Sequence, residues 1–146
     1  MTTNILALID FSEVTRAVVQ AAAEHAKLRG GKCWLMHVAA PDPDFVGYEV
    51  GPQYIRDSRA DVLRDEHKRL FALRESVTAQ GVECESLLVM GPLFETIDTE
   101  INKLNIDLVV LGSHGRSKLY ELVVGSVCEH LLRKAEVPLL VLPSQK

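Results

Sequence analysis

The sequence of 146 residues is poor in cysteine and has no long hydrophobic run. Its three cysteines, Cys33, Cys84 and Cys128, are far apart and form no C-x-x-C pair, so we expect reduced thiols, as in the cytoplasm, and no disulfide framework. The longest apolar runs have only the length of a β-strand, so no membrane-spanning helix is expected. The start, Met1 to Asn4, carries no positively charged side chain, and no secretory signal peptide is expected.

Positive charge is also scarce. The chain has 16 Lys and Arg against 20 Asp and Glu, a formal net charge of −4, and no run rich in basic residues. Proteins that bind nucleic acid without sequence preference need a positive surface, so we expect no nucleic-acid partner. The composition, 47% hydrophobic and 25% charged, is that of an ordinary globular protein, and the length fits one domain covering residues 1–146.

Several motifs of known chemistry are missing. The chain has no G-x-x-x-x-G-K-[ST], which excludes a P-loop NTPase. Its first apolar run is followed by Asp10-Phe11-Ser12 in place of G-x-G-x-x-G, which argues against a dinucleotide-binding Rossmann enzyme. There is no G-x-S-x-G, the sequence around the nucleophile of many serine hydrolases. No His and Asp pattern surrounds the cysteines, so a catalytic cysteine is not expected either.

The histidines do not suggest a metal site. His25 and His37 lie in expected core elements, where we expect hydrogen-bonded core histidines, and His67 and His130 are expected on helices away from a ligand site. No pair has the spacing of metal ligands supported by a carboxylate or a cysteine, so no structural metal is expected. His67 shares one side of a long polar helix with Leu63, Leu70, Arg74 and Val77.

Short apolar segments alternate with helical patterns along the chain. Alternating strands and helices predict a parallel sheet with helices on both faces, joined by right-handed crossovers. We therefore expect an α/β fold, one doubly wound domain with a five-stranded parallel sheet. The expected strands cover 5–9, 32–40, 82–90, 106–111 and 137–142, the expected helices cover 12–29, 56–80, 92–105 and 126–135, and a loop rich in proline and glycine covers 41–56.

A glycine loop follows the fourth expected strand. It reads Gly112-Ser113-His114-Gly115, then nine residues, then Gly125-Ser126. Ser126 and Glu129 have the spacing of a capping box, which predicts Ser126 as the N-cap of the last helix. A glycine loop that leads into a helix N-terminus favours an anion, above all a phosphate, and strand ends are where ligands bind in such sheets. Ordinary turn and cap chemistry is the alternative.

Charged residues near these strand ends support a ligand. His114, Arg116 and Lys118 would each be ordinary on a surface, but together in a chain of negative net charge they favour an anion. Asp10 ends the first expected strand. It is either the N-cap of the first helix, with Glu13 three residues later, or, if Ser12 is the N-cap, a carboxylate available to a ribose or to a metal ion on the phosphates.

With these residues in view, the chain resembles the universal stress protein family over essentially its full length. The resemblance is carried by G-x-x-G, nine residues and G-[ST], by the run GSHGRSKLYELVVGSVCEHLLRKAEVPLLVLP, and by the openings ILALIDFS and LMHV. It implies the adenine nucleotide alpha hydrolase-like fold, with strand order 3-2-1-4-5 and a ligand crevice flanked by Asp10 and Gly112. It also implies homodimers that pair their fifth strands, here Val137 to Leu142.

The resemblance further implies an adenine-nucleotide ligand, ATP or AMP, with or without Mg²⁺. The function would be that of a cytoplasmic stress-response regulator with an unknown signalling partner, and a slow ATPase, a self-phosphorylating enzyme or a plain interaction module are the alternatives. Phe11 departs from the family, which often has a small residue there, and would crowd the ribose. The implied contacts are Asp10 with the ribose, the backbone at Val38 with the adenine, and Gly112, Gly115, Ser126 and Val127 with the phosphates, Gly125 allowing their close approach.

Overall fold

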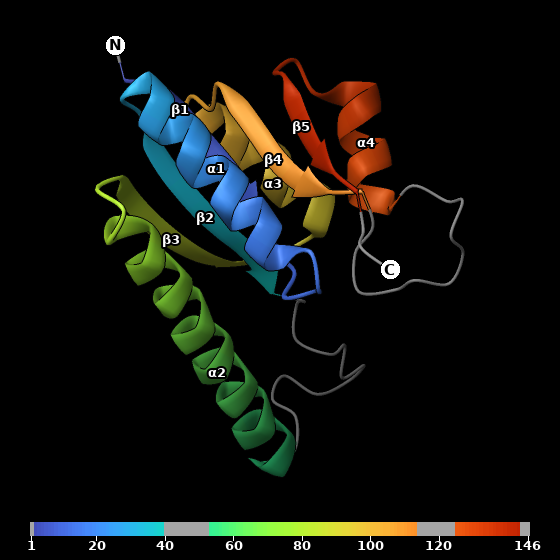
Figure 1. The fold of residues 1–146 in the computed structure, drawn as a ribbon. Helices are drawn as coiled ribbons and strands as arrows, with labels where there is room; N and C mark the ends of the chain where they lie inside the picture. Colours follow the sequence, from blue (N-terminus) through green and yellow to red (C-terminus); the bar gives the residue numbers. More distant parts are fainter. Residues whose placement is uncertain (1, 40–52, 114–124, 144–146) are drawn as a thin grey trace.

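The computed structural model describes residues 2–39, 53–113 and 125–143, with the side chains of 53–58 left out. Strands and helices alternate through these residues as the sequence predicts (Figure 1). The elements are β1 Asn4–Leu8, α1 Thr15–Arg29, β2 Lys32–Ala39, α2 Gln53–Thr78, β3 Glu83–Met90, α3 Leu93–Lys103, β4 Leu108–Gly112, α4 Ser126–Lys134 and β5 Leu139–Leu142.

The five strands form one parallel sheet in the order β3-β2-β1-β4-β5. The doubly wound α/β fold and its strand order are therefore confirmed. The chain moves from β1 to one side of the sheet through β2 and β3, and later to the other side through β4 and β5. This change of direction places a crevice at the carboxyl ends of β1 and β4, where ligands bind in sheets of this kind.

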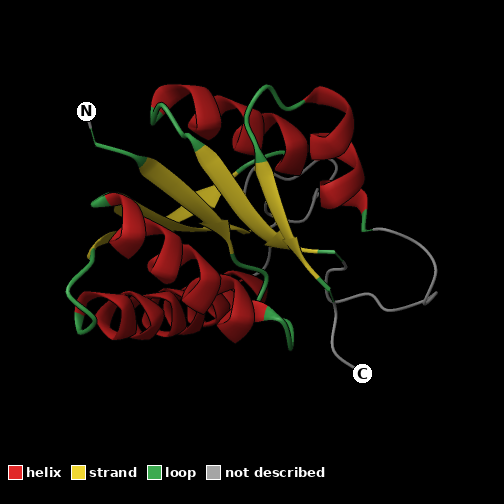
Figure 2. Ribbon diagram, turned by 45° about the horizontal axis from the view of Figure 1, so that its top comes forward, coloured by secondary structure: helices red, strands yellow, loops and turns green. Residues whose placement is uncertain are grey.

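Helices cover both faces of the sheet, as Figure 2 shows. α1 and α2 pack on one face, where Ile5 and Ala7 of β1 belong to the same buried cluster as Leu70 and Val77 of α2. Successive residues of a strand point to opposite faces, and Leu6 accordingly belongs to the other apolar core. A strand covered on both faces has to be apolar throughout, which is why β1 reads as a continuous apolar run.

α3 and α4 make the second layer. Ile97 and Ile101 of α3, together with Cys128 and Leu131 of α4, pack against Val109 and neighbouring strand residues. No helix in the described part of the chain is both long enough and apolar enough to cross a membrane.

The buried side of α2 differs from the expected one. Glu66, Leu70 and Val77 are buried, whereas His67 is exposed and Leu63 is only half-buried. Glu66 precedes Leu70 by four residues and Val77 by eleven, so it occupies the same side of the helix. The expectation that His67 lies on this side was wrong by one position.

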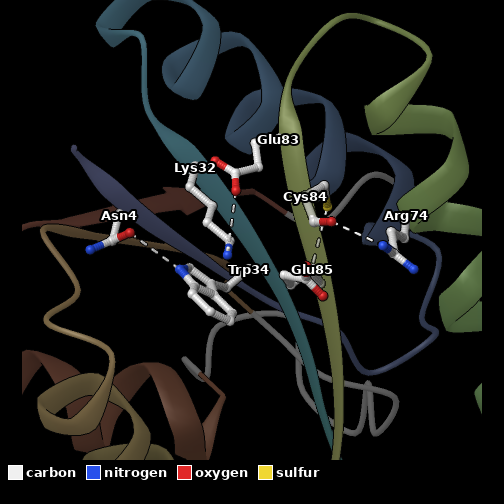
Figure 3. A network of polar contacts seen from close by, with 7 residues as sticks. All are labelled: Asn4, Lys32, Trp34, Arg74, Glu83, Cys84 and Glu85. Atoms are coloured by element: carbon white, nitrogen blue, oxygen red, sulfur yellow. Dashed lines mark hydrogen bonds and ion pairs between the residues drawn. The ribbon is translucent and has the colours of Figure 1, made fainter.

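The amino-terminal ends of β1, β2 and β3 carry a polar network, shown in Figure 3. The Trp34 indole N–H donates to Asn4 Oδ1 at 3.3 Å, and Lys32 Nζ lies 3.7 Å from Glu83 Oε1 and 4.1 Å from the centre of the Trp34 ring. In the neighbouring part, Arg74 of α2 donates from Nε to the carbonyl oxygen of Cys84 at 3.0 Å. These contacts join strand ends that lie opposite the crevice.

Two buried cysteines lie side by side in this part of the sheet. Cys33 of β2 is paired in register with Cys84 of β3, and both are free thiols. A hydrogen bond between the two side chains raises the pKa of Cys33 and lowers that of Cys84. The nearby cations of Arg74 and Lys32 also act to lower the Cys84 pKa.

Candidate functional site

A cavity of about 520 Å³ lies at the carboxyl ends of β1, β2 and β4. Its walls also include residues of α2, α3 and the start of α4. A volume of a few hundred cubic ångströms is typical of sites for small molecules and cofactors. The predicted site residues that line it are Asp10, Val38, Gly112, Gly125, Ser126 and Val127. His114, Gly115 and Arg116 lie outside the described residues, and the contacts of all these residues with a ligand stay a prediction.

The start of α4 forms one end of the cavity. Gly125 is the N-cap, with no side-chain hydrogen bond at the cap, and its N–H donates to the Ser113 carbonyl oxygen at 2.6 Å. The predicted capping box was therefore wrong. Ser126 is the first helical residue, and the Glu129 N–H donates to the carbonyl oxygen of Gly125. The first N–H groups of a helix have no partner within it, so this end of the cavity favours an anion.

Asp10 follows β1 and is held by the turn that leads to α1. Its Oδ1 accepts the Ser12 N–H at 2.9 Å and lies 3.5 Å from the Thr15 hydroxyl oxygen. α1 begins at Thr15, and its N-cap is Val14, without a side-chain cap bond. Both proposed N-caps, Asp10 and Ser12, were therefore wrong. Instead, the aspartate bonds to the backbone two residues on and so fixes its carboxylate at the cavity wall.

Phe11 is placed behind the cavity wall. Its φ of +59° is in the left-handed region, which is uncommon for a residue other than glycine. The ring packs against the His37 ring with the centroids 4.7 Å apart, and the Arg69 guanidinium lies 4.2 Å over it. Phe11 thus touches a lining residue without being part of the described lining, and its crowding of a ribose stays a prediction.

His37 and Glu66 form a buried pair at the opposite end of the cavity from α4. His37 Nδ1 lies 2.7 Å from the carbonyl oxygen of Ile9, and Nε2 contacts Glu66 Oε2. Each of the two side chains is only 11% exposed, and both residues line the cavity. The prediction of a hydrogen-bonded core histidine is confirmed for His37.

Sequence reasoning missed Glu66. A signal was present, because Glu66 stands four residues before Leu70 and so shares a side with the apolar residues of α2. A carboxylate on the apolar side of a helix is rarely buried unless it is paired, and its partner here is His37. Arg59 and Val62 of the same helix, with Leu93 and Ile97 of α3, are further lining residues that the sequence did not point to.

The described lining residues offer little nucleophilic chemistry. Burial raises the pKa of the Cys128 thiol, so this residue is a neutral thiol near pH 7. No group of three or more His, Cys, Asp and Glu side chains that could hold a metal ion is found among residues 2–39, 59–113 and 125–143.

Two curated relatives and one solved structure are similar to this chain over nearly their full length. The chain is 25% identical to the universal stress protein YxiE of Bacillus subtilis over 146 residues, covering 97% of this chain and 99% of that protein. It is 23% identical to the universal stress protein MJ0577 of Methanocaldococcus jannaschii, covering 94% and 93%. The solved structure of MJ0577 superimposes with a TM-score of 0.84 over 100% of this chain and 99% of that one, at 22% identity.

Two similar solved structures hold cyclic or deoxy forms of adenosine monophosphate. One is a universal stress protein in complex with cAMP, with a TM-score of 0.71, 17% identity and coverage of 99% and 98%. The other is the universal stress protein of Archaeoglobus fulgidus in complex with dAMP, with a TM-score of 0.63, 21% identity and coverage of 97% of both chains.

The match that shows the family covers almost the whole sequence. The model of the Universal stress protein family matches residues 1–143. The match includes every strand of the sheet and the cavity that lies at their carboxyl ends. The chain therefore belongs to the universal stress protein family.

Proposed function

We propose that this protein binds an adenine nucleotide, ATP or AMP, in the cavity and serves as a nucleotide-dependent regulator of a stress response. One observation carries the proposal: a single cavity joins the start of α4 with Asp10 and Val38. Because the strands lie in the order β4, β1, β2, the contacts with the phosphates, the ribose and the base would follow one another across the cavity in that order. Phosphates would meet the N–H groups at Ser126 and Val127, the ribose would meet Asp10, and the base would lie toward Val38.

The comparisons support an adenine nucleotide as the class of ligand. Two of the solved neighbours are complexes with cAMP and dAMP, and both compounds contain adenine, a five-carbon sugar and one phosphate. The cavity has the volume of a small-molecule site. Its lining includes the apolar side chains of Leu8, Met36 and Leu111. We extend the proposal to ATP because the chain keeps the complete glycine motif, Gly112-x-x-Gly115, nine residues and Gly125-Ser126.

Mg²⁺ could accompany the phosphates of ATP. Asp10 and Glu66 are the carboxylates among the described lining residues. Glu66 is engaged by His37, so Asp10 is the residue that we propose would meet the ion or its water shell. Slow hydrolysis of ATP in the same cavity is the alternative function. It would be recognised by turnover that survives repurification and is lost in Asp10→Ala.

The experiment that tests the proposal begins with the ligand that purifies with the protein. Heat-denatured protein should release an adenine nucleotide that mass spectrometry identifies, and calorimetry of the emptied protein should give an affinity for ATP or AMP well below millimolar. Absence of both a bound nucleotide and measurable affinity would refute the proposal. Cytoplasmic location, homodimer formation and the signalling partner stay predictions.

A further inference from the structure

The His37–Glu66 pair marks the end of the cavity that faces away from α4. α4 packs on β5, at one edge of the sheet, and α2 packs on β2 and β3, at the other (Figure 1). A nucleotide with its phosphates at the start of α4 would direct its base toward β2 and α2. Any role of the pair toward that base rests on the proposed function, because the proposed function places the nucleotide in this cavity.

The hydrogen-bond partners of His37 determine whether the second oxygen of Glu66 is a donor or an acceptor toward a ligand. A carbonyl oxygen only accepts, so Nδ1 carries a hydrogen that it donates to Ile9. One further hydrogen lies between Nε2 and Glu66 Oε2. It belongs either to an imidazolium beside a carboxylate or to a carboxylic acid beside a neutral imidazole. Neither arrangement puts a hydrogen on Oε1, so that oxygen is an acceptor in both.

The second carboxyl oxygen of Glu66, Oε1, takes no part in the contact with His37 and remains for a ligand. His37 is the hydrogen-bond partner of Glu66 among the described residues, and it uses Oε2. The side chain is 11% exposed and contributes to the cavity wall. A carboxyl oxygen at the wall of a cavity can accept a hydrogen bond from water or from a ligand in that cavity.

We infer that Glu66 Oε1 accepts a hydrogen bond from the exocyclic amino group of the adenine base, which makes Glu66 a specificity-determining residue. With one oxygen held by His37, the carboxyl group has a single acceptor left, which suits a single amino group. A purine with an oxo group at position 6 would place its acceptor oxygen against the acceptor Oε1, and no hydrogen bond would form between them. The pair therefore selects 6-amino purines over 6-oxo purines.

The test compares AMP with inosine monophosphate, which has the same ribose and phosphate and an oxo group in place of the amino group. Calorimetry on the wild-type protein should show AMP binding about tenfold or more tightly, because AMP donates a hydrogen bond where inosine monophosphate sets an acceptor against Oε1. Glu66→Leu should reduce this preference to about twofold or less, mainly by weakening AMP binding. Glu66→Gln should keep most of it, because the amide can donate to His37 and leave its oxygen toward the cavity. Glu75→Gln, the same change on the exposed side of α2, is the matched control and should alter neither affinity.

The outcomes separate this inference from the proposed function. AMP binding with the same preference in wild type and Glu66→Leu would overturn the inference and leave the proposed function standing, whereas failure of both nucleotides to bind the wild type would overturn both. If Glu66→Leu does not fold, wild-type protein carrying ¹³C-labelled glutamate supplies the measurement. The Glu66 carboxyl resonance, assigned by its loss in Glu66→Gln, should shift more with AMP than with inosine monophosphate. An unchanged resonance at saturating AMP would overturn the inference.

Discussion

Replacing Gly125 distinguishes two reasons for a glycine at the start of α4. Its φ of −59° and ψ of 153° are open to every residue, so the backbone conformation does not require glycine. The second reason is close approach. Gly125 lines the cavity beside the first N–H groups of α4, where a Cβ would keep an anion at a distance. The substitutions Gly125→Ala and Gly125→Ser tell the two reasons apart.

The effect of these substitutions on stability should be small. Alanine is the poorer N-cap by about 0.5 to 1 kcal/mol, but it also restricts the unfolded chain, which stabilises the protein by about 0.4 to 1 kcal/mol. The two contributions nearly cancel, so Gly125→Ala should melt within a few degrees of wild type. Gly125→Ser gains the entropic contribution together with a good cap, so its Tm should stay equal or rise by about 2 to 4 °C.

The effect on nucleotide affinity should be large. If the added Cβ moves a phosphate off one N–H of α4, the loss is about 1.5 to 3 kcal/mol, the contribution of a hydrogen bond to a charged group. The dissociation constant for ATP should therefore rise about 10- to 150-fold in both variants. Adenosine has no phosphate, so its affinity should change by less than about twofold.

Calorimetry with ATP and adenosine, combined with thermal melts by circular dichroism, measures all of these quantities. Folded variants that bind ATP as tightly as wild type would refute the placing of phosphates at the start of α4. Equal weakening of ATP and adenosine would show instead that the substitution deforms the cavity as a whole.

Four further predictions concern other parts of the chain. Arg116→Ala should weaken ATP more than adenosine in calorimetry if this residue meets the phosphates, and equal losses would contradict that role. Gly31→Ala should lower the free energy of unfolding in urea by about 1 to 3 kcal/mol, because a Cβ there would lie 2.4 Å from the Thr3 carbonyl oxygen; an unchanged midpoint would speak against it. Cys128 lines the cavity and burial raises its thiol pKa, so alkylation should be slow at pH 7, faster as the pH rises toward 9, and slower again with saturating ATP, as peptide mass spectrometry would show. β5 is an edge strand, so sedimentation should detect a homodimer paired through it, and a monomer at high micromolar concentration would exclude this pairing.

The sheet could be predicted from the sequence because its central strands β1, β2 and β4 are largely buried on both faces. Apolar runs such as 5–9 and 106–111 have no polar side that could face water, and the helical patterns between them require crossovers. Their order came from the family resemblance, since apolar strands pair equally well in several orders. The boundaries shifted by up to three residues, as for α1, which begins at Thr15 in place of Ser12.

The helix starts were predicted less well, because a cap depends on the path by which the chain enters the helix. Ser126 has the right side chain and the right spacing to Glu129 for a capping box. The bond from the Gly125 N–H to the Ser113 carbonyl oxygen nevertheless ties the chain to the end of β4 and puts the cap one residue earlier. The error bears on function, because a cap without a side chain leaves the N–H groups of α4 open to a ligand.

Glu66 was missed because its environment is made by three separate segments. The chain after β1 supplies the Ile9 carbonyl oxygen that orients His37, β2 carries His37, and α2 brings the carboxylate. No local pattern contains all three. The same geometry explains how a nucleotide could act on this protein as a regulator. A ligand that bridges the start of α4 and Glu66 touches helices that pack at opposite edges of one sheet, so its binding free energy depends on where both helices lie. A ligand shifts the equilibrium between two conformations only if its affinity for them differs. Here the contacts of the phosphates with α4 and of the base with Glu66 would make the affinity differ between arrangements of the two helices.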